Sequence, residues 1–259
     1  MNAGTLVLGL INGSIIGLLA AGFVLVYKAN RFLNLAHAQL GALAAMLVAK
    51  FVNDLGWNFW VAVMVCLPLG VATGLAVERL FIRPVRQRTT SSVRLLLLTV
   101  GISQLLLALT FVPFLAPDTN RVGAAFPQPF TSNLEVGGVV LSGMSVLTII
   151  VVPILLLALT GFLGFSSIGK QLRAAANNPQ AARLCGISIN RVSLITWGVA
   201  GGLSAVSAVL SGPNASTFNI GALGPNLLLY TMGAAAFGAF VSLPWSVGGG
   251  IALGVVYQL

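Results

Sequence analysis

The chain contains one long polar stretch, FSSIGKQLRAAANNPQAARLCGISINR at residues 165–191, between two apolar runs. These runs cover residues 139–163 and 192–212, and each is long enough to cross a bilayer, which takes about 20 residues. A polar stretch held between two such runs lies at one membrane face. The pattern therefore predicts a structured loop on the surface of a membrane protein.

The residues of this loop predict two short helices. Either serine at 166–167 can cap the first, with a body from Ile168 to about Ala176. Asn178 is a good N-cap for a second helix over Pro179–Cys185, because a proline at the first helical position loses no hydrogen bond. Gly186 suits the left-handed residue that ends a helix.

Small side chains give this loop a smooth surface that suits close docking onto a partner. The alanines concerned are Ala174, Ala175, Ala176, Ala181 and Ala182. The alternative is a basic loop that only follows the tendency of cytoplasmic loops to be positive. Composition and capping by themselves leave both interpretations open.

Composition places the whole chain in a membrane. Of its 259 residues, 58% are hydrophobic and 7% are charged, against roughly 25% charged residues in soluble domains. We expect an all-α polytopic bundle of about eight spans, forming one transmembrane domain over residues 1–259. The expected spans cover about 5–27, up to 52, 59–77, 95–115, 139–163 and 192–212, then a run from Pro225 and a last run from Val247.

The net charge of +9 does not indicate a nucleic-acid partner, because the basic residues lie between spans. Anionic lipids and a cytoplasmic partner are the expected counter-charges. With alternating spans, 11 basic residues fall on the side of the 165–191 loop, including those of a basic loop over 78–94. Only Lys50 and Arg121 fall on the other side, so the loop is predicted to be cytoplasmic and the N-terminus external.

Four motifs follow one another in a recognisable order. They are NLAHAQ at 34–39, ER and RPVR at 78–79 and 83–86, TVGIS at 99–103, and G-x3-R-A-x-A-N-x3-A-x4-G-I at 169–187. Together they resemble the permeases of ATP-binding-cassette importers, closest to the LivH family for branched-chain amino acids. The resemblance implies a type II importer permease fold in a bacterial plasma membrane. Its motif at 34–39 usually ends in Gly-Glu, whereas this chain has Ala38 and Gln39.

The resemblance also implies partners. These are cytoplasmic ATP-binding subunits, a second permease subunit and an extracytoplasmic substrate-binding protein, with ATP hydrolysed by the separate subunits. The residues expected at the ATPase contact are Gly169, Arg173, Ala174, Asn178, Pro179, Ala181, Ala182 and Gly186. Relatives generally continue for one more span, so the last helix is expected to be truncated at Leu259.

The first span carries glycines four residues apart, at Gly9, Gly13 and Gly17. Residues four apart share one helix face, so these glycines let another helix approach closely. The partner helix could belong to a second copy, but packing within this chain is the favoured interpretation.

The second span begins with an unusually polar segment, Asn34 to Gln39. A broken helix is expected here, because irregular backbone at membrane depth is tolerated where it lines a cavity or is buried in protein. His37, the single histidine, is interpreted as a neutral imidazole bonded between helices or as part of a substrate pathway. The expected pathway residues are Asn12, Ser14, Asn34, His37 and Gln39.

The expected spans carry no charged residue near their middle, where ion-coupled carriers usually keep one. No nucleophile, carboxylate pair or metal-ligand spacing indicates an enzyme or a cofactor. The sequence thus predicts the permease subunit of an ATP-driven importer for branched-chain amino acids or similar small polar solutes. The alternatives are a channel or facilitator working alone, a urea or short-amide permease, and a scaffold subunit without a pathway.

Overall fold

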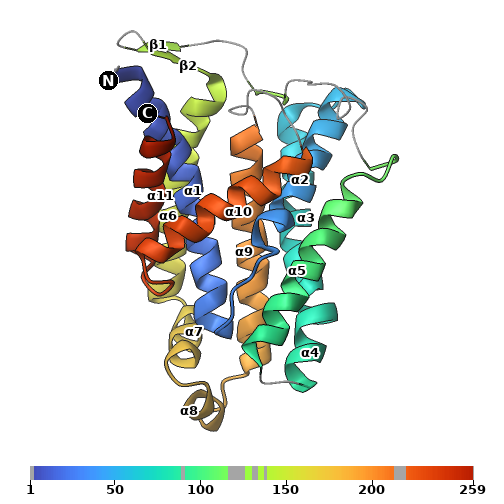
Figure 1. Cartoon of the computed structure of the whole chain (residues 1–259), viewed down its shortest axis with the longest axis vertical. Coiled ribbons are helices and arrows are strands. Elements are labelled where there is room, and N and C mark those ends of the chain that lie inside the picture. Colours follow the sequence, from blue (N-terminus) through green and yellow to red (C-terminus); the bar gives the residue numbers. More distant parts are fainter. Residues whose placement is uncertain are drawn as a thin grey trace.

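The computed structural model is an elongated bundle of helices and describes residues 3–88, 91–115, 126–129, 134–136, 139–212 and 220–258 (Figure 1). The two marked chain ends and a short hairpin lie at one end of the bundle. The elements are α1 (Ala3–Asn30), α2 (His37–Asn53), α3 (Phe59–Val77), the π-helix η1 (Glu78–Ile82), α4 (Arg83–Arg88), α5 (Ser92–Leu109), β1 (Leu134–Val136), β2 (Val139–Leu141), α6 (Gly143–Phe165), α7 (Ser167–Asn177), α8 (Pro179–Leu184), α9 (Ile189–Ser211), α10 (Ile220–Phe237) and α11 (Leu243–Gln258).

The expected all-α membrane bundle is confirmed. Five helices in the described part of the chain are long and apolar enough to cross a membrane: Gly4–Asn30, Phe59–Arg88, Ser92–Leu109, Gly143–Phe165 and Ile189–Ser211. The remaining long helices, α2, α10 and α11, pack against this set, and α10 crosses the bundle obliquely (Figure 1).

Glycines hold α1 against α11 at backbone distance. A Cβ added to Gly13 would lie 2.7 Å from both the Cα and the carbonyl oxygen of Ile251. Gly9 and Gly17 meet the α11 backbone in the same way, at Val255 and Val247. The face that these glycines share thus packs within the chain, as small residues commonly do between membrane helices.

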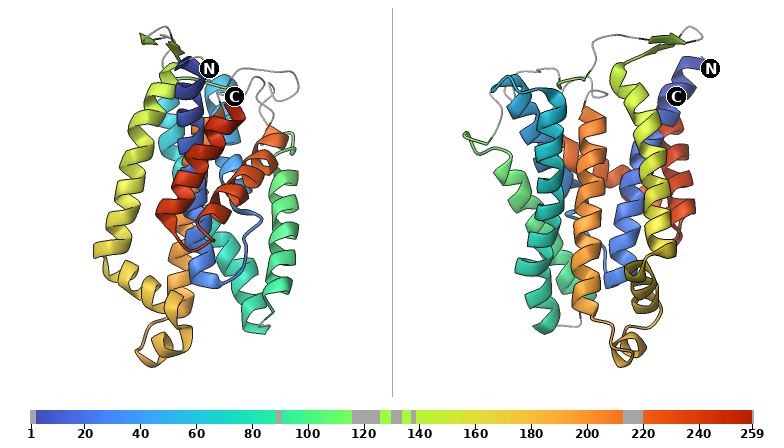
Figure 2. Two further views of the ribbon diagram at one scale, coloured as in Figure 1. Left: turned by 60° about the vertical axis from the view of Figure 1, so that its left-hand side comes forward. Right: turned by 180° about the vertical axis from the view of Figure 1, so that it is seen from behind.

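A second close contact joins α3 to α9. The carbonyl oxygen of Gly70 and the Cα of Gly74 face Gly201, and Gly74 also packs against the backbone of Trp197. The fully buried Trp197 side chain fills the space beside this contact and lies against Phe32. As a result α9 sits between α1 and α3 in the middle of the bundle (Figure 2).

The prediction of a basic loop over residues 78–94 is wrong for residues 78–88, which are helical. The chain continues from α3 without a break through η1 and α4, so it stays helical to Arg88. Burial of Glu78 with two arginines of the next turns explains this continuation, because the pairing works only if the helix goes on.

Smaller corrections concern helix ends. The fourth span ends at Leu109, and the fifth begins at Gly143 because Val139–Leu141 pairs with β1 instead. α10 starts at Ile220, so Pro225 lies inside it, and α11 starts at Leu243. The middle of the predicted outer loop, including Asp118 and Arg121, lies outside the described residues.

Candidate functional site at the start of α2

The second span is broken as expected, and α2 begins inside the bundle. After α1 the chain reverses at Arg31, which has a positive φ of 60°, and residues 31–36 are not helical. In Figure 1 this segment climbs back along the bundle, so that α2 starts roughly halfway up. The amino-terminal end of a helix, with its partial positive charge, therefore lies at depth.

Side chains satisfy the backbone of this irregular segment. Thr99 of α5 accepts a hydrogen bond from the Leu35 N–H (3.1 Å), and the Asn34 Oδ1 accepts one from the Ala36 N–H (3.1 Å). The NLAHAQ and TVGIS motifs thus meet in space. The N-cap Ala36 makes no side-chain cap bond, and the first amide of α2, the His37 N–H, donates to the Asn34 carbonyl oxygen (3.2 Å) instead.

His37 connects α2 to α1. Its Nε2 lies 3.0 Å from the carbonyl oxygen of Leu19, which can only accept, so this nitrogen carries the proton. The side chain is fully buried beside Phe23, and its Nδ1 has no partner in the described part of the structure. His37 is therefore placed between helices with one acceptor nitrogen unused.

Other buried polar atoms around the start of α2 also lack partners. They are Asn34 Nδ2 and both amide atoms of Gln39, counted among the described residues. Asn34 and Gln39 are only 1% and 3% exposed. A buried donor or acceptor without a partner costs about 1–3 kcal/mol, so a group of them in a native fold needs an explanation such as a ligand.

Two small residues let neighbouring helices close over this cluster. Gly224 of α10 lies directly on the Gln39 side chain, where any added Cβ would collide with the amide. On the other side Ser204 of α9 donates to the His37 carbonyl oxygen (2.7 Å) and accepts from the Gly41 N–H (3.0 Å). The start of α2 is thus enclosed by α1, α5, α9 and α10.

The structure separates Asn12 and Ser14 from this cluster. Both are half-buried on α1, and the Ser14 hydroxyl donates to Ile11 of its own helix (2.7 Å). Asn12 lies seven residues before Leu19, which is about 10 Å along a helix. Of the five predicted pathway residues, only Asn34, His37 and Gln39 come together.

A buried charge network that the sequence analysis missed joins α1, η1, α4 and α9. The carboxylate of the fully buried Glu78 contacts Arg83 (3.0 Å) and Arg86 (3.3 Å). Arg86 also donates to Asn30 Oδ1 (2.6 Å) and to Ser193 Oγ (2.8 Å). In the sequence, Glu78 is the one acid on the predicted membrane side that carries 11 basic residues. This isolated acid is the signal by which the network could have been found.

The two predicted helices of the polar loop are confirmed as α7 and α8. Ser166 caps the first by accepting from Gly169 N (2.9 Å), and Asn178 caps the second by accepting from Gln180 N and Ala181 N (3.0 Å each). Gly186 has a φ of 78° and forms, with Ile187, the two backbone bonds of a Schellman ending. Both helices lie at the end of the bundle opposite the hairpin (Figure 2).

The residues of this loop have different surroundings. Gly169 and Arg173 hold α7 under the last turn of α6, since the Arg173 guanidinium donates to the carbonyl oxygen of Leu163. The prediction that Ala182 contacts a partner is wrong for its side chain, which is buried within this chain in the same core cluster as Leu172, against which Ile187 packs. The exposed positions include Ala174, Asn178, Pro179, Ala181 and Gly186.

The sequence analysis did not single out one exposed apolar residue of α8, Leu184. The Leu184 side chain is 91% exposed, although leucine usually packs away from water. Its neighbour Cys185 is also exposed and free.

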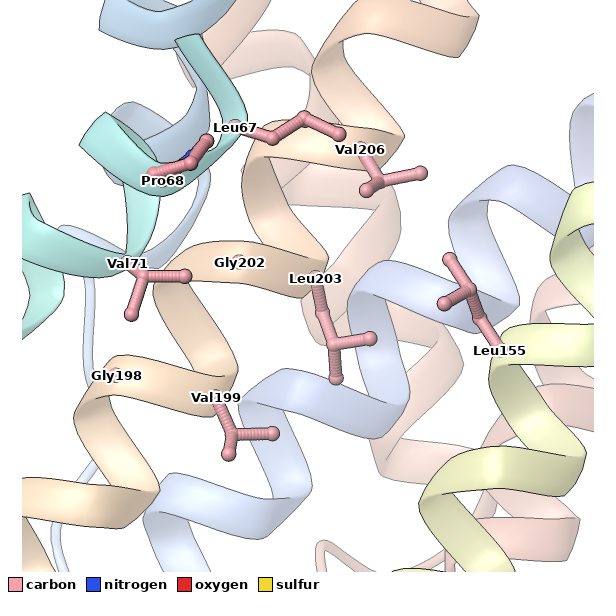
Figure 3. A pocket seen from close by; sticks show the side chains of 9 residues that line it. All are labelled: Leu67, Pro68, Val71, Leu155, Gly198, Val199, Gly202, Leu203 and Val206. Atoms are coloured by element: carbon pink, nitrogen blue, oxygen red, sulfur yellow. The ribbon is translucent and has the colours of Figure 1, made fainter. Parts of the chain in front are cut away.

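A cavity of about 560 Å³ lies between α3, α6 and α9 (Figure 3). Its walls carry the apolar side chains of Leu67, Val71, Leu155, Leu203 and others, and two glycines of α9. It contains no group that could pair with an ammonium or a carboxylate. No group of three metal-ligating side chains occurs in the described residues either.

Comparison with known proteins agrees with this geometry. The model of the family described as "Branched-chain amino acid transport system / permease component" matches residues 5–259. The chain belongs to this family. It is a multi-pass protein of the bacterial inner membrane, a transport permease rather than an enzyme.

Individual relatives share 25–29% sequence identity with this chain. The chain is 29% identical over 263 residues to the high-affinity branched-chain amino acid transport system permease protein BraD of Pseudomonas aeruginosa, covering 96% of this chain and 83% of the relative. It is 29% identical over 266 residues to the corresponding protein LivH of Escherichia coli, covering 97% and 83%. A probable LivH permease of Methanocaldococcus jannaschii is 25% identical over 203 residues, covering 78% and 63%. No solved structure matches the chain.

Proposed function

We propose that this permease is a subunit of an ATP-driven importer that carries branched-chain amino acids, with the cluster at the start of α2 on the solute pathway. The single observation that carries the pathway is the set of buried, unpartnered polar atoms on Asn34, His37 and Gln39. The names of the relatives support the solute class.

The chemistry of the cluster suits a zwitterion. The positive end of the α2 dipole, which has no side-chain cap, and the Asn34 Nδ2 donor suit a carboxylate, while the unused Nδ1 of His37 and the Gln39 Oε1 offer acceptors to an ammonium. Binding at half-helix ends near the bilayer midplane is common in transporters. All of these groups are neutral. After a solute without net charge has passed, no unpaired buried charge therefore remains on the protein.

The energy for uptake comes, in this proposal, from cytoplasmic ATP-binding subunits that dock at α7 and α8. A second permease subunit and an external substrate-binding protein complete the importer. The rigid caps of α8 and the exposed Leu184 support this assignment, because movement passes best through a short, stiff element with an apolar anchor. Asn178, Pro179 and Gly186 shape that element, and Ala181 and Leu184 are its exposed surface.

The pathway is tested by uptake of radiolabelled leucine into proteoliposomes that hold the assembled importer. Asn34→Leu and His37→Phe should each lower uptake at least about tenfold, since one lost polar contact of about 1.4 kcal/mol already gives that factor. Thr148→Val is the control, because Thr148 is equally buried but bonds only within its own helix. If both variants show unchanged uptake at equal subunit content, the solute pathway does not pass through this site.

Docking is tested with the native thiol on α8. The exposed Cys185 should react with maleimide in the isolated permease and be protected when the ATPase subunits bind, while the buried Cys66 stays silent. Leu184→Glu should abolish copurification of the ATPase, because burying an unpaired charge at an interface costs a few kcal/mol. Leu55→Glu, an exposed leucine before α3, is the control. Leucine flux through the permease alone would instead indicate a facilitator.

A further inference from the structure

A second cavity, of about 510 Å³, lies between α1, α6, α7 and α11. Ten of its 13 lining residues are apolar or glycine, among them Leu25, Leu159 and Val247. The polar ones are Lys28, Thr160 and Arg173. The cavity is therefore a mostly apolar slot that carries two cations.

The two cations lie at one end of the slot. Lys28 is in the last turn of α1, and Arg173 is on α7, at the end of the bundle where α7 and α8 lie (Figure 2). Leu25 and Ala21 line the slot one and two turns further back along α1, towards the interior of the bundle. The slot thus runs from a basic mouth at the membrane surface to apolar walls at membrane depth.

Among the described residues, no carboxylate pairs with the positive charge at this mouth. Lys28 lies close enough to Arg31 and to Arg173 for its like charge to interact with theirs. Both ion pairs found in the described residues belong to Glu78, so none of these three cations pairs with a carboxylate. Arg31 and Arg173 donate only to backbone carbonyl oxygens, of Ala176 and of Leu163 and Gly164, and so keep donors free.

We propose that this slot binds an anionic phospholipid of the inner leaflet, with its phosphate at Lys28 and Arg173 and one acyl chain along the apolar walls. Basic pockets between helices on the cytoplasmic side suit such head groups, and the bilayer supplies the ligand at high concentration. An amino acid does not fit, because the mouth offers no carboxylate for an ammonium group. The same argument favours an anionic over a zwitterionic lipid.

This inference does not depend on which solute the permease carries. The contact of the lipid with both α1 and α7 would tie the first span to the cytoplasmic loop. A lipid that binds the folded permease there stabilises it by RT ln(1 + L/Kd), where L is the free lipid concentration, so the stabilisation grows with lipid concentration. The cavity of Figure 3 is apolar but has no cation, so it offers an internal comparison.

The test is native mass spectrometry of the purified full-length permease titrated with phosphatidylglycerol or with phosphatidylcholine of equal chain length. Wild-type protein should retain phosphatidylglycerol preferentially, and Lys28→Gln should weaken that retention about fivefold, the contribution of one basic residue near a membrane surface. Lys28→Arg should preserve it. Lys170→Gln, which removes an exposed charge of the same α7, should leave it unchanged.

Two further arms identify the ligand. Leu25→Trp should reduce retention of the lipid by filling the slot, whereas Val199→Trp in the cavity of Figure 3 should not alter the preference for phosphatidylglycerol. Glycerol phosphate at the same concentration should not compete, because it lacks the acyl chain. Equal retention by wild type and Lys28→Gln, competition by glycerol phosphate, or loss of the lipid when ATPase subunits are bound would each overturn the proposal.

Discussion

The helices α1 and α9 differ from α5 and α6 in a way that hydropathy does not anticipate. In the most apolar stretch of each helix, 72% of residues are buried in α1 and in α9, against 22% in α5 and 17% in α6. Yet α6 is the most apolar of the five candidate spans and α9 the least. Hydropathy therefore does not indicate burial here: α1 and α5 differ little in hydropathy but greatly in burial, and the most apolar span, α6, is the least buried.

The reason is that lipid is as apolar as a leucine side chain, so apolar surface gains little by leaving it. Helices meet in the interior through small residues and polar contacts instead, as at Gly13 with Ile251 and at Ser204 with His37. The outer faces keep large side chains such as Leu157, which is 72% exposed. The comparison predicts that the same type of substitution has a larger effect in the buried helices α1 and α9 than in the lipid-facing helices α5 and α6.

The largest difference is expected for glycine to leucine. Gly13→Leu would drive a side chain into the α11 backbone and should cost more than the roughly 1–3 kcal/mol that extra methylenes cost in a packed core. Gly161→Leu on α6 meets no atom within 4 Å and should be tolerated. The effect of each substitution is measured by the folded yield and the melting temperature in detergent. Similar behaviour of the two variants would show that burial does not separate these helices.

A smaller effect is expected for the buried ion-pair network, which ties η1 and α4 to the buried helices α1 and α9. Arg86→Ala would remove one partner of the buried Glu78 and break the contacts to Asn30 and Ser193. Because Arg83 remains, the cost should lie near 3 kcal/mol, the lower end for a broken buried pair. Arg88→Ala removes an exposed charge of α4 and should change the melting temperature little. Equal melting temperatures would mean that the network does not stabilise the packing of η1 and α4 against α1 and α9.

The smallest effect concerns single hydroxyl groups. Ser204→Ala removes two bonds between α9 and α2, and each such bond is worth about 0.6 kcal/mol on average in membranes, with roughly 1.7 kcal/mol as the upper bound. Thr160→Val on α6 loses only a bond within its own helix and should cost less. Unfolding curves in mixed micelles can resolve the difference. A larger loss for Thr160→Val would reverse the comparison.

Features that depend on neighbours in sequence were predictable. The capping residues Ser166 and Asn178, the proline after Asn178, and Gly186 fixed α7 and α8 to within one residue. Local hydrogen bonds decide such helix ends, so the residue types alone are sufficient. The break before α2 was also readable, because polar residues interrupt an apolar run.

Features that depend on distant residues were not predictable. Ala181 and Ala182 are identical in type, yet one is exposed and the other buried. The continuation of α3 into α4 depends on a carboxylate finding two arginines and a partner helix. The sequence analysis grouped Asn12 and Ser14 with Asn34 from proximity to the glycines, but the fold separates them.

The sequence by itself determined the membrane environment, the helical class, the caps of α7 and α8 and the family, because composition and short-range spacing carry that information. Only the tertiary structure decided which polar residues share a buried site. Gln39 packs against Gly224, and Lys28 and Arg173 line the same cavity, across separations of well over a hundred residues. Such pairings follow from how close two helix backbones can approach, which is a property of both helices together and of neither sequence segment alone.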